Sequence, residues 1–524
     1  MPPSTSSGVT EDSGESSSNS DHEPLSFLQP LGYSASSCGY CSEVKGARST
    51  AKSSRSYGCW AHTLSTSAYK ALLDRGWRRS GAYLYKPDLA HTCCPQYTIS
   101  LDPHHFRPSR SQRQVLQRFA AFVRDGEREG QPGWGPPVQA ATPAAAGGDR
   151  GDVVMDGAQH TGAGEGARAG KKKQDKGKGK GKGKGKGKGK GKGKGKAAQG
   201  EAADWAESVH AGDWERSTPQ QPFKHRFEYI IEPASFTEEK FALFKRYQME
   251  VHGEPASKVS AKGFRRFLCD TPLDIETTHS SAFSYGSHHA LYRLDGVLIA
   301  FAVLDLLPRA VSSVYFVWNP DYSGMSLGKI SALREALLVR EMEKAGAWEG
   351  GGGRYMMGFY IHTCPKMRYK ADYQPSFLLD PEANTYVPFA QCKPYLDTGA
   401  RITSFSGPLP PSTAAPAPAA PTSAPVQPPP APGSAASSEE EEEEENEGED
   451  DDVAFPSPPP PGCLDPLSLP KDLLLSSLVL ERRRLVPLLL SAAWHDPAAQ
   501  REVRELLAGT GDELAGRVAL FMGR

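Results

Sequence analysis

The sequence predicts an α+β protein with two folded regions, residues 25–120 and 223–405, followed by a small helical segment at residues 465–524. Helical and strand patterns alternate within both regions. Of the 524 residues only 38% are hydrophobic, whereas 53 are Gly and 44 are Pro. Such a chain cannot bury enough apolar surface to fold along its whole length, so we expect long linkers between the folded regions.

Three stretches have compositions typical of disorder. Residues 1–24 are Ser-rich and acidic, residues 121–222 contain an almost unbroken Lys-Gly alternation from 171 to 196, and residues 406–464 are Pro-rich and then acidic. Glycine loses much backbone entropy on folding and like charges repel each other, so no compact structure is expected there. The Lys-Gly tract either holds RNA loosely through counterion release or is a solvated spacer.

Charge and cysteine usage restrict the class of protein. The formal net charge is -1, but lysines and acidic residues are segregated into separate tracts, so the average hides a basic region. No stretch has the pattern of a secretory signal or of a bilayer span, so we expect no membrane partner and a location in the cytoplasm, with the nucleus left open. In a reducing compartment, nine cysteines predict metal ligands or buried thiols rather than disulfides.

Short elements are predicted for the first region. Residues 66–74 have the pattern of a capped helix, residues 82–86 and 96–101 have strand patterns, and residues 108–119 predict a basic helix without acidic side chains. Aromatic residues are frequent between these elements and supply candidates for the core. The region is therefore predicted to be a small mixed domain that contains most of the cysteines.

The second region begins with a strand at residues 227–231, then a helix with Ser235 and Glu238 as its capping box, and a further helix at 261–268. Strands and one long amphipathic helix follow in alternation. They are strands at residues 290–294, 297–307 and 312–318, the helix at 326–345 and a strand at 354–362. This order resembles the acetyltransferase-like GNAT fold of acyltransferases, in which a central sheet opens to admit an acyl donor and an amine.

Two cysteine pairs have the spacing of a metal site. Cys38-Gly-Tyr-Cys41 puts two thiolates on one side of a tight loop, and the adjacent Cys93 and Cys94 can complete a tetrahedral site. Four sulfur ligands suit zinc or an iron–sulfur cluster. The alternative is a redox pair together with two buried thiols.

Longer motifs in both regions carry a family resemblance. In the first region they are Cys38-Gly-Tyr-Cys41, Trp60-Ala61-His62, Asp74-Arg75-Gly76-Trp77-Arg78-Arg79-Ser80-Gly81, Tyr85-Lys86-Pro87 and Thr92-Cys93-Cys94-Pro95-Gln96-Tyr97-Thr98-Ile99. In the second they include Phe244-Lys245-Arg246-Tyr247-Gln248, Val311-Ser312-Ser313-Val314-Tyr315, Ala332-Leu333-Arg334-Glu335 and Met357-Gly358-Phe359-Tyr360-Ile361-His362-Thr363-Cys364-Pro365-Lys366-Met367-Arg368-Tyr369-Lys370. Both sets resemble eukaryotic arginyl-tRNA–protein transferases.

The resemblance implies an acyl transfer from a tRNA to a protein. An arginyltransferase of this family is expected to move arginine from Arg-tRNA to the N-terminal α-amino group of proteins that begin with Asp or Glu. The product would be marked for ubiquitin-dependent degradation in the N-degron pathway. The resemblance also implies that Cys38, Cys41, Cys93 and Cys94 ligate an iron–sulfur cluster or zinc. We expect no ATP or CoA, because the aminoacyl ester is already activated and no P-loop is present, and we expect a monomer.

Candidate catalytic residues lie in the segment that follows the last strand of the second region. The reaction needs placement more than a strong base, since a free α-amino group has a pKa near ~8. His362 or Tyr360 would accept or relay the amine proton, and Arg368 or Lys366 would pair with the acidic side chain of the acceptor, with Lys370 beside them. The alternative is that His362 and Tyr360 are core residues of a strand.

Further candidates come from a strand and from basic residues. Asp305 lies in an apolar strand, where an acid usually has a partner or a function, and we count it as catalytic. Ser312 and Ser313 begin the next strand and are candidates for substrate binding. The predicted tRNA footprint consists of basic residues with aromatic neighbours, which are Arg75, Arg78, Arg79, Lys86, Arg110, Arg113 and Arg118. The alternative for each is a solvated surface charge.

Two other functions are compatible with parts of the sequence. One is an RNA-binding adaptor with an inactive acyltransferase-like domain, which would bind RNA without transferring arginine. The other is an acetyl-CoA-dependent N-acetyltransferase, which needs a Gly-rich pyrophosphate loop leading into a helix. The run from Asn319 to Gly328 lacks that spacing.

Overall fold

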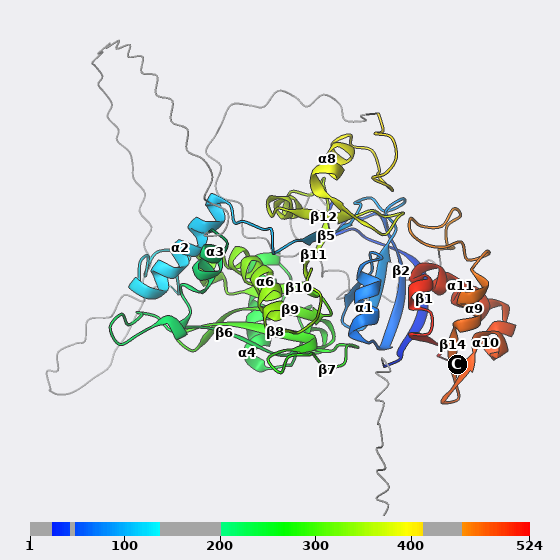
Figure 1. Ribbon diagram of the computed structural model, residues 1–524, viewed down its shortest axis with the longest axis horizontal. Coiled ribbons are helices and arrows are strands. Elements are labelled where there is room, and N and C mark those ends of the chain that lie inside the picture. The colour runs from blue at the N-terminus through cyan, green and yellow to red at the C-terminus, as the bar shows by residue number, and fades with distance from the viewer. Residues whose placement is uncertain (1–23, 42–47, 137–200, 412–452, 524) are drawn as a thin grey trace, which may run out of the picture. The chain divides into compact units, whose positions relative to one another are not determined.

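The computed structural model describes residues 24–41, 48–136, 201–411 and 453–523 (Figure 1). The Lys-Gly tract and the acidic run at 439–452 lie outside these residues, as do residues 1–23. No helix in the described ranges combines the length and the apolar character that crossing a bilayer requires. The described elements belong to two sheets and the helices that cover them.

A seven-stranded sheet contains the N-terminal elements. Its strand order is β15-β14-β16-β1-β2-β4-β3. The strands are β1 (Ser26–Ser36), β2 (Ser54–Thr63), β3 (Arg78–Ser80), β4 (Tyr83–Pro87), β14 (Leu478–Glu481), β15 (Arg484–Pro487) and β16 (Val518–Phe521). Helix α1 (Thr66–Leu73) begins at Ser65, whose hydroxyl accepts a hydrogen bond from the Ala68 amide, and buries Tyr69 and Leu72. The predicted helix at 66–74 and strand at 82–86 are therefore present.

The last segment of the chain differs from the helical prediction. Helices do occur there, namely α9 (Lys471–Ser476) and α11 (Pro497–Thr510), with the short α10 (Ala492–His495) between them. However, β14, β15 and β16 lie in the same segment, and β16 pairs in parallel with β1, with Ser26 opposite Val518. Strand β1 offers main-chain hydrogen-bonding groups along its edge, and β16 pairs with the first three residues of that edge, Ser26 to Leu28.

A second, nine-stranded sheet contains the elements of the second region. Along its main path the strand order is β13-β12-β5-β11-β10-β9-β8-β6, and β7 pairs with β8. The strands are β5 (Tyr97–Leu101), β6 (Phe227–Pro233), β7 (Glu276–Thr277), β8 (Ser284–Leu294), β9 (Val297–Leu307), β10 (Ala310–Trp318), β11 (Arg354–Tyr360), β12 (Ser376–Leu379) and β13 (Tyr386–Pro388). Strand β5 comes from the first region but lies between β11 and β12, so the two regions share this sheet.

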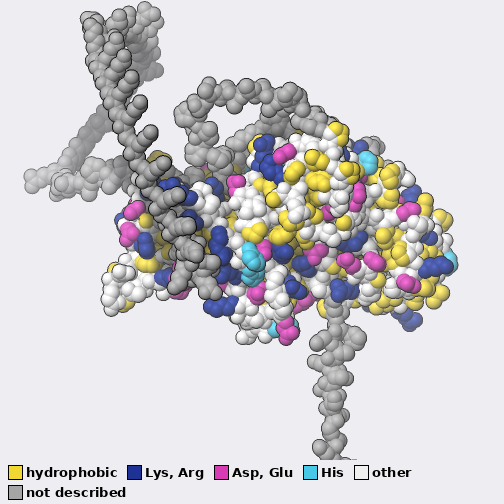
Figure 2. Space-filling model, turned by 45° about the horizontal axis from the view of Figure 1, so that its top comes forward, with side chains coloured by type: hydrophobic (Ala, Val, Ile, Leu, Met, Phe, Trp, Pro, Cys, Tyr) yellow, Lys and Arg dark blue, Asp and Glu magenta, His cyan; other side chains and the backbone are white. Residues whose placement is uncertain are grey.

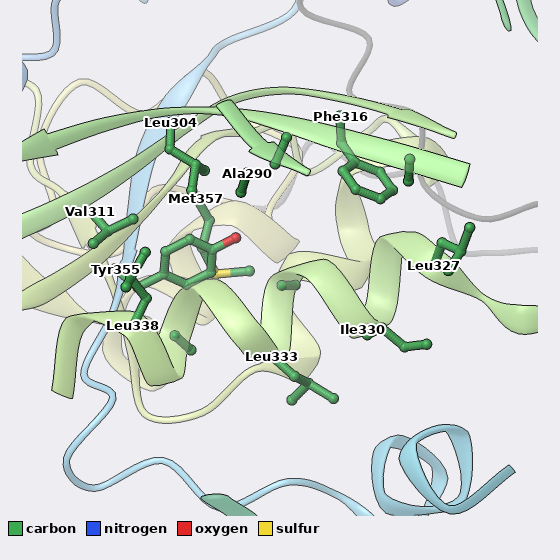
Figure 3. Close-up of a cluster of buried hydrophobic side chains, with 14 of the residues drawn as sticks. Ala290, Leu304, Val311, Phe316, Leu327, Ile330, Leu333, Leu338, Tyr355 and Met357 are labelled. Atoms are coloured by element: carbon green, nitrogen blue, oxygen red, sulfur yellow. The ribbon is translucent and has the colours of Figure 1, made fainter. Parts of the chain in front are cut away.

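Helices cover the second sheet. They are α2 (Arg110–Asp125), α3 (Glu201–His210), α4 (Glu238–Tyr247), α5 (Ala261–Phe264), α6 (Leu327–Lys344), α7 (Pro365–Arg368) and α8 (Phe389–Asp397). Helix α6 packs on β10 and β11 and also contacts α2. Figure 3 shows Tyr355 and Met357 between the sheet and α6, whereas Ile330 and Leu333 point away from the sheet. Helix α6 is therefore buried on two sides, and polar side chains along it are enclosed as well.

Two local predictions in the second region differ from the structure. Thr237 caps α4 by accepting a hydrogen bond from the Lys240 amide, so the predicted capping box of Ser235 and Glu238 is wrong. The Ser235 hydroxyl is instead within 3.1 Å of the buried Lys240 ammonium group. Helix α5 is followed directly by a π-helical turn at Arg265–Cys269, which together span the predicted helix at 261–268.

Candidate functional site

The neighbouring parallel strands β10 and β11 separate part of the way along their length. Their paired residues run from Ala310 opposite Arg354 to Ser312 opposite Met356, although both strands continue beyond this point. In β10 the register with β9 shifts between Ser313 and Tyr315, which is the signature of a bulge. The sheet therefore opens toward the carboxyl ends of these two strands.

A cavity lies at this opening. Most of its lining comes from four parts of the chain: β10, β11, the start and middle of α6, and the β3–β4 hairpin of the other sheet. The lining residues include Ser312, Ser313 and Phe316 of β10, Met357, Gly358 and Phe359 of β11, Gly328, Ser331 and Glu335 of α6, Arg78, Arg79 and Tyr85 of the hairpin, and Tyr40, Met367 and Lys370 from loops and short helical turns. The cavity therefore combines apolar walls with a few charged and hydroxyl groups, as binding sites commonly do.

Glu335 is the carboxylic acid of this lining. It is 1% exposed, and burial raises the pKa of its carboxyl group. The Tyr355 hydroxyl donates to it at 2.6 Å and the Ser331 hydroxyl also bonds to it. These hydroxyls hold the carboxyl group in place without a cation. Such a carboxyl group can take up or release a proton at a pH above the usual pKa of a glutamate side chain.

Two cations of the lining are buried as well. Lys370 is 5% exposed and donates from Nζ to the Phe359 carbonyl at 2.6 Å. Burial, assisted by the nearby Arg78 guanidinium, lowers the pKa of Lys370 to about 7. Arg78 is 6% exposed, donates from Nη1 to the Trp77 carbonyl at 2.8 Å, and lies over the Phe359 ring at 5.2 Å from its centroid.

Asp305, predicted to be catalytic, pairs with a third cation. Arg79 donates to it through Nε at 2.9 Å and through Nη2 at 2.6 Å, and the Ser287 hydroxyl donates at 2.7 Å. Arg79 and Asp305 are both buried, so the pair is a desolvated, bidentate link between β3 and β9. Asp305 does not belong to the cavity lining, and in this structure its carboxylate is occupied by Arg79.

The remaining predicted catalytic and substrate-binding residues fall into two groups. Ser312, Ser313 and Lys370 line the cavity, as described above, whereas the others lie outside the lining. The Tyr360 hydroxyl is 2.9 Å from His362 Nδ1, and His362 Nε2 is 3.2 Å from Asp397 of α8. Burial lowers the pKa of His362 and raises that of Tyr360 to about 12. Lys366 and Arg368 are exposed, and Arg368 donates from Nε to the His362 carbonyl at 3.0 Å.

The predicted tRNA footprint is divided between the interior and the surface. Four of its residues are buried, namely Arg75, Arg78, Arg79 and Lys86. Arg75 donates to the Gly462 carbonyl at 3.0 Å and Lys86 donates to the Arg75 carbonyl, so neither faces outward. Arg110, Arg113 and Arg118 are exposed on α2. On the face shown in Figure 2, positive and negative side chains are interspersed over the described residues.

The four cysteines of the predicted metal site come together. The Sγ atoms of Cys38, Cys41, Cys93 and Cys94 all lie within 4.8 Å of one another, and those of Cys41 and Cys93 are 3.7 Å apart. Zn–S bonds of about 2.3 Å in tetrahedral geometry put sulfurs roughly 3.8 Å apart, and the Cys41–Cys93 separation of 3.7 Å is close to this value. A cluster with several irons would need the sulfurs to spread.

Without a cation, the four thiols of this cluster cannot all ionise. The pKa of Cys38 is lowered to about 5, chiefly because Cys94 donates a hydrogen bond to its sulfur, whereas burial and the Cys38 sulfur raise the pKa of Cys41 to about 11. A bound metal would stabilise all four thiolates. Cys38 and Cys94 also pack against Ile361, Cys364 and Met367, the turn that follows β11. The cluster therefore adjoins the cavity wall.

Sequence reasoning missed Glu335 as a site residue and assigned Arg78 to tRNA. A signal for Glu335 was available, because it follows Ser331 by four residues on a helix whose surrounding positions are apolar. A charged residue at such a position requires a partner or a function. No comparable signal exists for Arg78, because its burial depends on how the β3–β4 hairpin meets the other sheet.

Comparison with known proteins connects this geometry to a family. Residues 36–114 match the family described as "Arginine-tRNA-protein transferase, N terminus", and residues 239–380 match "Arginine-tRNA-protein transferase, C terminus". The chain is 34% identical over 411 residues to arginyl-tRNA–protein transferase 1 of Drosophila melanogaster, covering 70% of this chain and 82% of the fly protein. It is 30% identical over 487 residues to arginyl-tRNA–protein transferase 1 of Arabidopsis thaliana, covering 71% and 74%.

A shorter match joins the chain to bacterial enzymes. It is 32% identical over 161 residues to an aspartate/glutamate leucyltransferase of Pseudomonas fluorescens, covering 30% of this chain and 60% of that protein. The names of both groups describe enzymes that transfer an amino acid, which is arginine in the first group and leucine in the second.

Proposed function

The chain belongs to the arginyl-tRNA–protein transferase family, and on that premise we propose that it transfers arginine from Arg-tRNA to the N-terminal α-amino group of proteins that begin with Asp or Glu. The observation that carries the proposal is the opening between β10 and β11, where a buried carboxyl group, two serine hydroxyls and three buried cations meet in one cavity. An opening of this kind is what a GNAT-like acyltransferase needs. The likeness to an aspartate/glutamate leucyltransferase supports acidic acceptors.

Glu335 is our candidate for accepting the proton of the acceptor amine. The α-ammonium group has a pKa near ~8 and must lose a proton before its nitrogen can attack. Because burial raises the pKa of Glu335, its carboxylate is a better base than an exposed glutamate. The nitrogen then bonds to the ester carbonyl carbon, the bond from that carbon to the ribose oxygen breaks, and the ribose oxygen takes up one proton. The second amine proton is released to solvent.

Other predicted residues have supporting roles in this proposal. Ser312 and Ser313 would donate hydrogen bonds to the oxyanion that develops on the ester carbonyl. Tyr360 and His362, hydrogen-bonded to each other at the end of β11, remain candidates for relaying protons to solvent. Asp305 would act through Arg79, which it holds at the cavity wall. Lys366 and Arg368 would contact the acceptor polypeptide from the surface.

The four cysteines would hold zinc or an iron–sulfur cluster. The bound group would cross-link the Cys38–Cys41 turn to the Cys93–Cys94 turn, and an iron–sulfur cluster would add a redox-active centre. Met367 links this cluster to the cavity, because it packs against Cys38 and Cys94 and also lines the cavity. The protein groups, rather than the metal, handle the substrates in our proposal.

For Arg-tRNA we propose that the exposed arginines of α2 bind phosphates. Arg110, Arg113 and Arg118 are exposed there, and neutralising a phosphate releases condensed counterions. Binding should therefore weaken as salt rises. We further propose that the products enter ubiquitin-dependent degradation and that the protein acts in the cytoplasm.

A transfer assay with the full chain tests the proposal. The purified protein, prepared without oxygen, is offered Arg-tRNA carrying labelled arginine and peptides that begin with Asp, Glu or Leu, with N-acetylated peptides as blanks. We expect label on the Asp and Glu peptides only. Glu335→Gln should lower kcat by roughly 10²- to 10⁴-fold, as loss of a general base does, whereas Glu349→Gln, at an exposed glutamate, should not.

The alternatives give different results in the same assay. An RNA-binding adaptor would retain Arg-tRNA on a filter but label no peptide. An N-acetyltransferase would modify peptides only when acetyl-CoA is supplied. Either outcome would rule out arginine transfer by this chain.

A further inference from the structure

The cavity contains positive charge that no carboxylate neutralises. Arg78 and Lys370 are 6% and 5% exposed, and neither takes part in an ion pair within the part of the chain that the structure describes. Their hydrogen bonds go to backbone carbonyl groups, with Lys370 donating to Phe359. The Nε–H of Arg78 is buried and has no hydrogen-bond partner among the described residues. A buried, incompletely paired cation is costly, and proteins normally supply an anion for it.

The next residue of the same strand shows what a neutralised arginine looks like here. Arg79 is also 6% exposed, but Asp305 holds it through two hydrogen bonds and Ser287 through a third. Because Asp305 already neutralises its charge, Arg79 does not need an anion from a ligand. Arg78 therefore differs from its neighbour in lacking a carboxylate, although the two are equally buried.

The carboxyl group in the cavity does not serve as the missing anion. Glu335 receives its hydrogen bonds from Tyr355 and Ser331, and no ion pair with a cation is found for it among the described residues. An anionic ligand would therefore supply the negative charge that Arg78 lacks among the described residues.

We propose that Arg78, with Lys370 beside it, binds the side-chain carboxylate of the acceptor's first residue and so selects Asp and Glu. This inference rests on the proposed function and deepens it. A guanidinium group presents its N–H donors as a planar fork that matches the two oxygens of a carboxylate. The Gly358 carbonyl accepts a long hydrogen bond from Arg78 Nη2 at 3.5 Å, which a bound carboxylate can replace.

The size and walls of the cavity favour a side chain over a nucleotide. Its volume is about 80 Å³, enough for a short acidic side chain, so the arginyl ester and the rest of the acceptor would reach the cavity from the open end between β10 and β11. Phe316, Met357 and Phe359 form apolar walls around the charged groups. A hydrated phosphate of the tRNA would therefore lie outside it, and the carboxylate of a short acidic side chain would fit.

Matched peptides test the inference. The full-length protein is assayed with peptides that differ only in starting with Asp or Asn, and with Glu or Gln, at fixed Arg-tRNA. Arg78→Gln should lower kcat/KM for the Asp and Glu peptides by roughly 10- to 150-fold, the equivalent of one hydrogen bond to a charged group. The kcat/KM values for the Asn and Gln peptides should change little, so the variant should lose its preference for acidic over amide peptides. Arg78→Lys should restore part of it.

Controls separate the possible failures. The KM for Arg-tRNA should stay the same in Arg78→Gln, and Arg293→Gln, which removes an arginine from a partly exposed ion pair with Glu239, should keep full discrimination. An equal loss for acidic and amide peptides would overturn the inference in favour of a structural role. A raised KM for Arg-tRNA with unchanged discrimination would overturn it in favour of phosphate binding. If the unmodified protein labels no peptide at all, the proposed function itself has failed.

Discussion

Lys370 carries an ammonium group that the fold encloses, and its ionisation should therefore affect stability. Its pKa in the folded protein is about 7, whereas an unfolded lysine has a pKa near ~10.4. Between these values the unfolded chain binds a proton that the folded chain lacks, so stability rises with pH. At and below pH ~7 the folded state carries the full cost of the buried charge.

We therefore expect Lys370→Met to stabilise the protein more at pH 7 than at pH 9. The change in unfolding free energy relative to the parent should be larger at the lower pH by roughly 2–3 kcal/mol. Urea denaturation at both pH values measures it, and comparing the two values cancels the pH-independent loss of the hydrogen bond to Phe359. Lys344→Met, at an exposed lysine of α6, should change the unfolding free energy by the same amount at both pH values. A pH-independent effect of Lys370→Met would mean that its ammonium is solvated.

Residues of the site could be predicted from the sequence where a local pattern, such as the spacing of cysteines, indicates their role. The four cysteines come together as their spacing predicts, and Ser312, Ser313 and Lys370 do line one cavity. Arg78 is predicted to contact tRNA because it is basic and has aromatic neighbours, but a sequence does not reveal that a second sheet covers this strand. The partner of Asp305 was hidden for the same reason, since Arg79 is 226 positions away.

At the scale of elements, the loops that hold the cysteines are joined to the site by packing. Cys38 and Cys94 contact the turn after β11 through Ile361, Cys364 and Met367. A metal there would fix two N-terminal turns against that wall of the cavity. Losing it would remove the link between the two turns, although Cys93 would keep its main-chain hydrogen bond to the Ser53 carbonyl at 2.9 Å.

We expect Cys93→Ser to lose the bound metal and to lower kcat. Metal content per chain should fall from about one site to near zero, because binding requires all four thiolates. Elemental analysis of protein prepared without oxygen measures this, and the visible spectrum separates iron–sulfur from zinc, which has no colour. Cys463→Ser, at a cysteine outside the cluster, should keep the metal. Full metal content in Cys93→Ser would remove that residue from the ligand set.

Elements with strong periodicity were predicted well, and those that depend on distant partners were not. The predicted strands at 297–307 and 96–101 and the helix at 326–345 agree with β9, β5 and α6 to within a residue or two. The separation of β10 from β11 could not be predicted in position, because the pairing of parallel strands depends on residues far apart in the chain. Strands β1 and β2 were not predicted at all, since their small and polar residues lack a clear alternation.

At the scale of the whole chain, the C-terminal segment is part of the N-terminal core. Leu506 of α11 is fully buried in the cluster that also contains Leu28, Tyr57 and Trp77. The Trp77 indole donates to the Gly509 carbonyl at 3.0 Å. Because Arg78 follows Trp77 directly, this segment also helps to hold the hairpin that reaches the cavity.

We expect Leu506→Ala to destabilise the N-terminal sheet, not only the tail. Removing a buried leucine typically costs about 2–5 kcal/mol of unfolding free energy. Urea denaturation measures the loss, and hydrogen exchange should show faster exchange of the β1 and β2 amides. Leu475→Ala, at a leucine that is 65% exposed, should change neither. Unchanged exchange in β1 and β2 would mean that the tail is an independent unit.

The division of the chain into two folded regions was only partly predictable. Composition identifies the Lys-Gly and acidic tracts, but the predicted linker at 121–222 overlaps the end of α2 and the whole of α3. Composition also says nothing about which strands share a sheet. Strand β5 belongs to the first region in sequence and to the second sheet in space. Its pattern predicts a strand correctly, whereas its neighbours follow from the packing of the complete protein.

The parallel pairing of β1 with β16 has a consequence for biosynthesis. A ribosome delivers residues 26–28 almost five hundred residues before it delivers their partners at 518–520. Throughout translation the first strand keeps one open edge, which chaperones or another nascent chain can reach. Messages truncated before the final strand should therefore yield polypeptides prone to aggregate rather than shorter working enzymes.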